Sequence, residues 1–141
     1  MKEKDTQNIY AYLTFNGNCK EAMTFYKHCL GGKLVLHTIR ECPFSKNFPE
    51  EIKNIVLHAT LTNGNFVLIG TDLVEEGGLV KGNSLSLMLY CSSEENIRSY
   101  FNKLSAGGRP TQPLIRNHYG ILFGNLVDRY GNHWLLNYNP K

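Results

Sequence analysis

The chain has 141 residues, of which 42% are hydrophobic and 19% charged, and its formal net charge is +3 at pH 7. This composition is ordinary for one soluble globular domain, here taken as residues 1–141, and no apolar run reaches the roughly 18 residues of a membrane span. The polar start MKEKDTQN is unlike a signal peptide, and Lys and Arg form no cluster typical of a nucleic-acid footprint, so we expect neither a membrane nor a nucleic-acid partner.

The first predicted elements are a strand and a helix. Aromatic and β-branched residues favour a strand over Ile9–Phe15, and the Asn-Gly pair that follows predicts a turn. A helix is predicted from Asn18 to Leu30, because its apolar residues follow a helical period and Gly31 and Gly32 come directly after it. Asn18 and Glu21 have the spacing of a capping box, which would satisfy free amides at the start of this helix.

Three more strands complete the first unit, and they are predicted at residues 34–40, 54–62 and 65–71. Between the first two of them, the proline-broken segment 41–53 predicts an irregular covering loop. The Asn63-Gly64 pair predicts a two-residue hairpin turn between the last two strands. The resulting register sets His58 opposite Ile69.

A glycine-rich stretch at residues 75–83 predicts a linker between module one (about 8–74) and module two (about 84–141). The second module repeats the order of the first, with strands predicted at residues 85–91, 114–116, 120–127 and 132–139. Its helix is predicted from Ser92 to Ser105, where Ser92 and Glu95 have the capping-box spacing.

The two predicted helices correspond residue by residue at an offset of 75 positions. Ala22, Phe25, Tyr26, Cys29 and Gly32 of the first unit match Ile97, Tyr100, Phe101, Leu104 and Gly107 of the second. A fixed period of this kind is typical of a fold built from repeated units, each of which needs its neighbour to complete a core. We therefore expect two tandem β-α-β-β-β units.

Three stretches of the chain carry a family resemblance, and they are YLTFNGNCKEAMTFYKHCLGGKL (12–34), IVLHATLTNGNFVLIGTD (55–72) and GNLVDRYGNHWLLNY (124–138). They resemble the signature stretches of the PhnB-like branch of the vicinal oxygen chelate superfamily, which includes glyoxalase I, bleomycin-resistance proteins and extradiol dioxygenases. The resemblance implies an α+β fold in which two tandem βαβββ modules form a glyoxalase-like curved mixed sheet with a central cleft.

Catalytic members of this superfamily bind a divalent ion through His, Gln or Glu side chains on the first and last strands of each module. Alignment to the glyoxalase pattern places at these positions Ala11, Ile69 or Gly70, Ser86, and Leu135 or Asn137. None of these side chains is a good ligand for a divalent ion. We therefore predict no metal-binding residues and no cofactor. The alternative is a divalent metal ion held by an atypical set that includes His58 or other histidines.

His58 is the candidate catalytic residue. The resemblance implies a histidine in this strand and an aspartate after the next strand, here Asp72. His58 would serve as a general acid or base, because imidazole exchanges protons near neutral pH. The simpler interpretation is a sheet histidine hydrogen-bonded to the backbone. The predicted register argues against direct contact between His58 and Asp72, and both Asp72 and Asp128 follow strands as turn formers do.

Aromatic side chains on the predicted strands, with basic residues near the mouth of the cleft, would bind a planar or amphipathic small molecule by stacking and apolar burial. The predicted ligand-binding residues are Tyr12, Arg40, His58, Tyr90, Arg116, His118, Trp134 and Tyr138. The alternative is that most of these aromatic residues belong to the core.

Three functions follow from these observations. The first is a small-molecule binding protein that uses no metal, and the second is a divalent-metal-dependent lyase, isomerase or dioxygenase. The third is an interaction module whose function is its dimer, since the resemblance implies a homodimer. The four cysteines contain no CxxC pair, which indicates reduced thiols and a cytoplasmic location.

Overall fold

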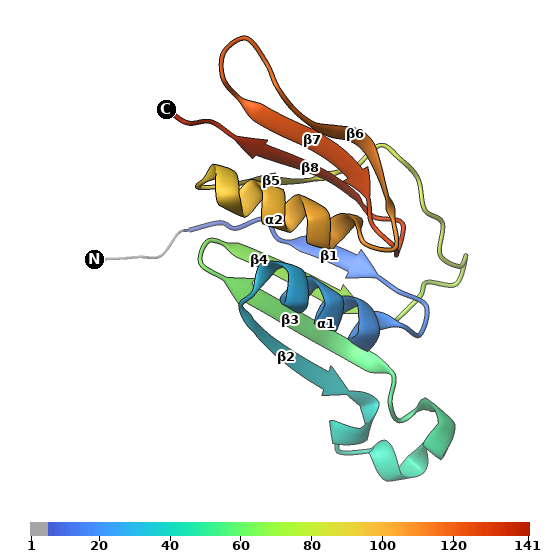
Figure 1. The fold of residues 1–141 in the computed structure, drawn as a ribbon. Coiled ribbons are helices and arrows are strands. Elements are labelled where there is room, and N and C mark those ends of the chain that lie inside the picture. The colour runs from blue at the N-terminus through green and yellow to red at the C-terminus, as the bar shows by residue number, and fades with distance from the viewer. Residues whose placement is uncertain (1–5) are drawn as a thin grey trace. The chain divides into compact units, whose positions relative to one another are not determined.

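The structure is a computed structural model, and it describes residues 6–141. These residues form two compact units that divide between Leu79 and Val80. Each unit has the element order β-α-β-β-β and folds into a four-stranded mixed sheet with one helix (Figure 1). The predicted α+β fold of two tandem modules is therefore confirmed. Within residues 6–141, no helix has the length and apolar character needed to cross a membrane.

Unit 1 contains helix α1 (Cys19–Leu30) and four strands in the spatial order β1-β4-β3-β2. The strands are β1 (Ala11–Thr14), β2 (Lys33–Thr38), β3 (Val56–Asn63) and β4 (Phe66–Thr71). β1 runs parallel to β4, and the other neighbouring strands are antiparallel. α1 lies across one face of this sheet (Figure 1), where a Cβ atom at Gly70 would come within 2.9 Å of the Met23 sulfur.

Unit 2 contains helix α2 (Glu94–Ser105) and four strands in the corresponding order β5-β8-β7-β6. The strands are β5 (Leu87–Tyr90), β6 (Arg109–Arg116), β7 (Leu122–Val127) and β8 (His133–Tyr138). β5 runs parallel to β8, as β1 does to β4. α2 lies across one face of its sheet (Figure 1), and a Cβ atom at Gly124 would come within 2.8 Å of the Phe101 ring.

The predicted repeat is visible in the helix residues that enter the core. Three matched pairs are buried in their own units, and they are Ala22 and Ile97, Tyr26 and Phe101, and Cys29 and Leu104. The matched glycines after the helices, Gly32 and Gly107, both have positive φ angles, of 108° and 81°. The repeat therefore preserves the inward side of each helix and the backbone turn that ends it.

The start of each helix differs from its prediction. Asn18 precedes α1, but its side chain makes no capping hydrogen bond, so the predicted capping box of the first helix is wrong. The second helix begins at Glu94 and not at Ser92, and Ser93 caps it by accepting a hydrogen bond from the Asn96 amide. Ser92 and Ser93 are chemically equivalent as helix caps. Which of them caps the helix depends on the residue at which the backbone turns from extended to helical.

The hairpin between β3 and β4 also has a different register from the predicted one. Asn63 pairs with Phe66, so the two turn residues are Gly64 and Asn65. Gly64 has a positive φ of 57°, which suits the first position of this kind of turn. Continuing the register by one residue beyond its last pair places His58 beside Thr71, and the predicted pairing of His58 with Ile69 is wrong.

Two proline-containing segments have more regular secondary structure than the sequence analysis predicted. The loop after β2 contains three short 3-10 turns, at Ile39–Glu41, Ser45–Asn47 and Glu50–Ile52. β6 extends over eight residues, although only 114–116 was predicted as strand. β6 lies at the edge of its sheet, and its register with β7 shifts between Pro110 and Gln112 and again between Gln112 and Ile115. An edge strand tolerates prolines because it has no second neighbour that needs their missing amides.

Candidate functional site

The side chains of the first sheet alternate between the side of α1 and the opposite side. Gly70, Ala59 and Leu36 are aligned across β4, β3 and β2 on the α1 side. The residues between them point the other way and form a surface that we call the Tyr12 face. Its members are Tyr12, Thr14, Val35, His37, His58, Thr60 and Ile69.

Strand pairing arranges the centre of the Tyr12 face in rows. Tyr12 is aligned with Ile69, which is aligned with Thr60, which in turn is aligned with Val35. Tyr12 is 56% exposed and Val35 is 40% exposed, so this row presents apolar surface to solvent. An exposed aromatic side chain beside aliphatic ones, with polar groups at the margin, is typical of a surface that binds an apolar partner or ligand.

His58 belongs to this face and touches its aromatic residue. The rings of Tyr12 and His58 lie edge to face, with centroids 6.4 Å apart and an interplanar angle of 65°. His58 is exposed, and neither of its ring nitrogens bonds to another residue of the described chain. The simpler interpretation of His58, a sheet histidine satisfied by the backbone, is therefore wrong. Its imidazole nitrogens are available to a ligand.

The strand next to His58 brings a second histidine, which the sequence analysis did not single out. His37 of β2 is the cross-strand partner of His58. Its Nδ1 lies 3.1 Å from a carboxylate oxygen of Glu41, in the 3-10 turn that follows β2. The signal that could have found this pair was the antiparallel alignment of residues 34–40 with 54–62, which depends on the bulge beside His37.

Asp72 has a structural role. One carboxylate oxygen accepts hydrogen bonds from the backbone amides of Gly17 and Cys19, at 3.0 and 2.9 Å, and the other accepts from the Val56 amide at 3.0 Å. Asp72 therefore occupies the capping position that Asn18 leaves unused. Burial, together with the nearby Asp72 charge, raises the pKa of the Cys19 thiol to about 12. Cys19 is therefore a buried structural cysteine whose thiol stays protonated.

Unit 2 presents an equivalent surface, which we call the Tyr90 face. Met88 and Tyr90 of β5 are aligned with Leu135 and Asn137 of β8, on the side opposite α2, and Phe123 and Ile115 continue the second of these rows. Tyr90 is 73% exposed and Met88 50%. The second module thus also has an exposed aromatic residue on its short edge strand, although the position that matches Tyr12 is Met88 and the one that matches Tyr90 is Thr14.

Trp134 and Tyr138 lie on the α2 side of β8, aligned with Leu126 and Leu122 of β7. Trp134 is only 3% exposed, and its indole nitrogen donates a 2.8 Å hydrogen bond to Asp128. The same carboxylate accepts bonds from the Tyr130 and Asn132 amides, which makes Asp128 a turn former. We therefore leave Trp134 and Tyr138 out of the candidate surface.

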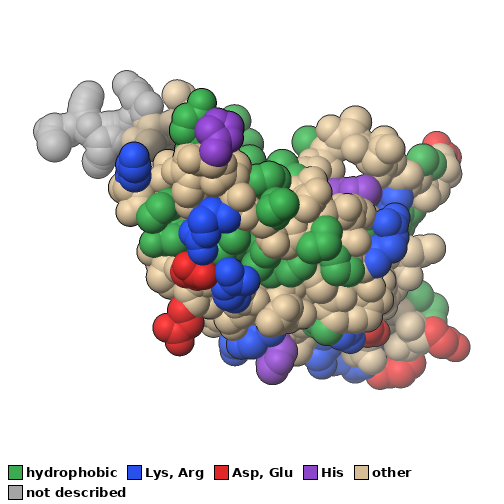
Figure 2. Space-filling model, turned by 45° about the horizontal axis from the view of Figure 1, so that its top comes forward, with side chains coloured by type: hydrophobic (Ala, Val, Ile, Leu, Met, Phe, Trp, Pro, Cys, Tyr) green, Lys and Arg blue, Asp and Glu red, His purple; other side chains and the backbone are tan. Residues whose placement is uncertain are grey.

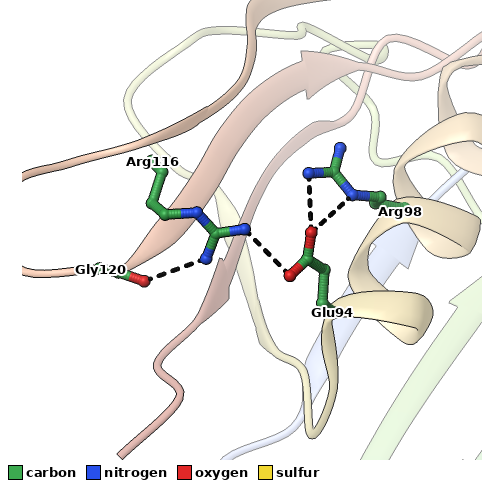
Figure 3. A network of polar contacts seen from close by, with 4 residues as sticks. All are labelled: Glu94, Arg98, Arg116 and Gly120. Atoms are coloured by element: carbon green, nitrogen blue, oxygen red, sulfur yellow. Dashed lines mark hydrogen bonds and ion pairs between the residues drawn. The ribbon is translucent and has the colours of Figure 1, made fainter.

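Arg116 is held in a polar network at the start of α2 (Figure 3). Its guanidinium donates to Glu94 at 2.9 Å and to the Gly120 carbonyl at 3.3 Å, while Arg98 donates to the same Glu94 carboxylate. Hydrogen bonds from Arg98 and Arg116 lower the pKa of Glu94. Both arginines are half-exposed, so the network orders the end of β6 at the surface.

The remaining predicted binding residues lie outside both faces. Arg40 pairs with Glu50 at 2.9 Å, and the hydrogen bonds from Arg40 and Lys53 lower the pKa of Glu50. The His118 ring lies against that of Tyr119 in the loop between β6 and β7, with centroids 4.1 Å apart and an interplanar angle of 39°. Figure 2 shows Lys and Arg side chains spread among hydrophobic ones over the face drawn, which matches the even distribution of charge along the sequence.

Four of the residues that the alignment places at the superfamily's metal positions, namely Ala11, Ile69, Gly70 and Leu135, offer no side-chain donor atom to a divalent ion. Ala11 and Gly70 point to the α1 side, and the residues that occupy the Tyr12 face at these places are Tyr12 and Ile69. In unit 2, Leu135 is aligned with Met88 on the Tyr90 face. Aliphatic side chains offer no donor atom to a hard or borderline cation. Across residues 6–141, no group of three or more His, Cys, Asp and Glu residues could hold a metal ion.

Comparison with known proteins identifies relatives of the whole chain. The family model for 3-demethylubiquinone-9 3-methyltransferase matches residues 7–137. Protein PA1353 from Pseudomonas aeruginosa is 31% identical, with a TM-score of 0.80 over 95% of this chain and 98% of that one. A PhnB protein from Bacillus cereus, also named for 3-demethylubiquinone-9 3-methyltransferase, is 29% identical, with a TM-score of 0.75 over 94% and 100%.

A more distant structure shares the fold alone. A glyoxalase/bleomycin resistance protein/dioxygenase family enzyme from Burkholderia phytofirmans is 12% identical, with a TM-score of 0.63 over 92% of this chain and 95% of that one. Each comparison spans both units. The shared feature is therefore the tandem β-α-β-β-β architecture.

Proposed function

The chain belongs to the 3-demethylubiquinone-9 3-methyltransferase family, within the PhnB-like branch of the vicinal oxygen chelate superfamily, and on that premise we propose that it binds a planar or amphipathic small molecule on the Tyr12 face. The observation that carries the proposal is the edge-to-face contact between Tyr12 and His58 on an exposed sheet surface. Tyr12 offers an aromatic surface for stacking, and His58 offers nitrogen atoms to a polar group of the ligand.

The chemistry of the row around Tyr12 supports this class of ligand. Ile69 and Val35 would contact an apolar body, while the Thr60 hydroxyl between them can donate or accept a hydrogen bond. A planar ring carrying oxygen substituents and an apolar tail has this distribution of properties. The compound in the family's description, 3-demethylubiquinone, is such a molecule and belongs among the candidate ligands.

The Tyr90 face would supply a second surface of the same kind. Tyr90 and Met88 are its exposed apolar residues, and Asn137 is its amide. The two faces lie on the same side of their modules, but Tyr12 corresponds to Met88, and Tyr90 lies two residues further along its strand. A ligand that stacks on Tyr12 therefore has a related surface available at Tyr90, with the aromatic ring displaced along the strand.

The proposal is tested by measuring the melting temperature of the purified protein against a panel of quinones, flavonoids, other planar phenols and aliphatic metabolites. We expect planar, oxygen-substituted compounds to raise the melting temperature. At a ligand concentration of one hundred times Kd, binding should increase the free energy of unfolding by about 2.7 kcal/mol. Aliphatic metabolites of similar mass should have no effect. A panel in which no planar compound shifts the melting temperature would contradict the proposal.

The alternative proposal is an enzyme in which His58 acts as a general acid or base. An exposed imidazole within reach of a bound ligand can exchange a proton with it. Incubation of a panel ligand with the protein, followed by mass spectrometry, tests this alternative. Product that forms with the unaltered chain and not with the His58→Gln variant would favour the enzyme, whereas unchanged ligand would favour binding alone.

We also propose that the protein is a cytoplasmic homodimer. The family resemblance supports the dimer, and the exposed apolar side chains Val80 and Leu85, which precede the edge strand β5, offer surface for a second copy. Four free cysteines, two of them buried, suit a reducing compartment. Light scattering during size-exclusion chromatography should give twice the chain mass of 16.0 kDa.

A further inference from the structure

A lysine and an arginine occupy matching positions in the two units. Each follows the two glycines that come after its helix, in the stretches 31–33 and 107–109. Lys33 begins β2 and Arg109 begins β6, and these strands lie at corresponding edges of their sheets. The repeat therefore places a cation at the same corner of each sheet.

Both cations lie on the side of the sheet that faces away from the helix. Val35 belongs to the Tyr12 face, and Lys33, two residues before it on β2, shares its side. In unit 2, Arg109 is aligned with Val127, which alternates with buried residues of β7 and shares the side of Phe123 on the Tyr90 face. Each exposed face therefore has one cation at the start of its outer strand.

Complementing the helix dipole does not explain these two cations. The last turns of α1 and α2 already contain Lys27 and Lys103, which are placed to do so. Lys33 and Arg109 are exposed, and neither side chain forms an ion pair or hydrogen bond with another residue in the range 6–141. Their charges are therefore available to a ligand.

The row through Tyr12 changes from apolar to polar in the direction of Lys33. Tyr12 and Ile69 are its apolar members, and Thr60 lies two strands from Tyr12, about 10 Å at the usual strand spacing. Thr60 is the diagonal neighbour of Lys33, and Thr62 is directly opposite Lys33. The ammonium group and both hydroxyls can donate to an anionic oxygen. A ring stacked on Tyr12 thus directs an acidic group about 10 Å away toward Lys33.

The matching row of unit 2 has the same order. Met88 and Leu135 are its apolar members, and Leu135 is aligned with the amide side chain of Asn125. Asn125 is the diagonal neighbour of Arg109, as Thr60 is of Lys33 in unit 1. The planar guanidinium of Arg109 suits a carboxylate, because it can donate two parallel hydrogen bonds to it.

The one carboxylate that contacts the Tyr12 face lies at its other end. Glu41 is 3.1 Å from His37, and His37 follows Lys33 by four residues, roughly 13 Å along an extended strand. The negative charge of Glu41 disfavours an anion at the His37 end of β2. The face is thus polarised so that an anionic group is favoured at Lys33.

We propose that the ligands of both faces are planar compounds with an anionic oxygen group, a carboxylate or an ionised ring hydroxyl, and that Lys33 and Arg109 bind this group. The inference rests on the proposed function, because it specifies the class of ligand that the Tyr12 face and the Tyr90 face take. It assigns charge recognition to the outer strands β2 and β6, and ring recognition to the inner rows.

The test compares 2-naphthoate with its uncharged analogue 2-naphthamide, which has the same ring system. Each compound is titrated near neutral pH into the unaltered protein, and two-dimensional amide NMR gives a separate Kd for each face. We expect 2-naphthoate to bind about fivefold more tightly than 2-naphthamide on both faces, and high salt should reduce this preference. Equal affinities would overturn the inference and leave binding on the faces intact. Shifts on neither face with either compound would overturn both proposals.

Substitution then assigns the charge to each residue. Lys33→Gln should raise the Kd of 2-naphthoate about fivefold on the Tyr12 face alone, and Arg109→Gln should do so on the Tyr90 face alone. Neither variant should change the Kd of 2-naphthamide. Lys27→Gln and Lys103→Gln are the matched controls, because each removes an exposed lysine from the helix of the same unit. An unchanged 2-naphthoate Kd in Lys33→Gln or Arg109→Gln, or an equal rise in the controls, would overturn the assignment.

Discussion

A carboxylate oxygen of Asp72, directly after β4, accepts a 2.9 Å hydrogen bond from the backbone amide of Cys19, the first residue of α1. The side chain therefore joins the last strand of unit 1 to the start of its helix. Its second oxygen accepts from the Val56 amide at the start of β3. One residue thus ties three elements together, and at α1 it does so through free amides of the kind that every helix start presents.

Replacing Asp72 with alanine should destabilise unit 1. Three backbone amides would lose their acceptor, and at least two of these bonds are partly buried, so we expect the free energy of unfolding to fall by about 2–4 kcal/mol. Urea denaturation followed by circular dichroism measures this change. Glu76→Ala is the control, because Glu76 is exposed in the irregular segment after β4, and its effect should stay within about 0.5 kcal/mol. Equal effects of the two substitutions would contradict the capping role.

Gly32 is a position where any side chain should be costly. Its φ is +108°, and a Cβ atom there would lie 2.5 Å from the Thr62 carbonyl oxygen and 2.9 Å from the Asn63 Cβ. Gly32→Ala should therefore destabilise the protein by about 3 kcal/mol through backbone strain and steric overlap. Gly77→Ala provides the comparison, since that position is open and has no positive φ. A thermal melt that gives both variants the same midpoint would refute this account of the repeat's glycine.

The Glu94 network predicts a dependence of stability on pH. Hydrogen bonds from Arg98 and Arg116 hold the pKa of Glu94 below the ordinary value of 4.5. The Glu94 carboxylate therefore binds a proton less readily in the folded state than in the unfolded chain. The contribution is therefore complete above the unfolded pKa and disappears as the pH falls through the lowered folded pKa. When the pH falls from 6 to 3, the free energy of unfolding should therefore decrease less in the Glu94→Gln variant than in the unaltered chain.

The control for this pH dependence is Glu95→Gln, because Glu95 lies in the same helical turn and is exposed to solvent. Urea unfolding at both pH values, at low and high salt, gives the comparison. The difference between Glu94→Gln and the unaltered chain should shrink in high salt, as expected for exposed charges. A Glu95→Gln variant with the same reduced acid sensitivity would contradict the network's role.

The elements of the fold were predictable because periodic apolar residues and glycine stops act locally. The match of Ala22 with Ile97 and of Cys29 with Leu104 identified the inward side of both helices, and these residues are buried. The caps were less predictable. Asn18 has the right residue type, yet Asp72, 54 positions further on (72 − 18), occupies the site through a tertiary contact that no local pattern contains.

The residues of the candidate surface were harder to predict, because they depend on the pairing register of the strands, and moving a turn by one residue changes that register. Placing the hairpin turn at Gly64 and Asn65, one residue later than predicted, brings His58 beside Thr71. The same alternation places Tyr12 on the exposed face and Trp134 in the core, although both are aromatic residues on strands. Residue type alone could not separate them, because the difference lies in which side of the sheet each residue occupies.

The most direct test of the account is calorimetric titration of a planar panel ligand into the unaltered protein, Tyr12→Ala and Trp134→Phe. Loss of the stacking surface in Tyr12→Ala should raise Kd about tenfold, equivalent to about 1.4 kcal/mol. Trp134→Phe should lower stability, because it removes the bond to Asp128, and leave Kd within about twofold. An unchanged Kd in Tyr12→Ala, or a large rise in Trp134→Phe alone, would contradict binding on the Tyr12 face.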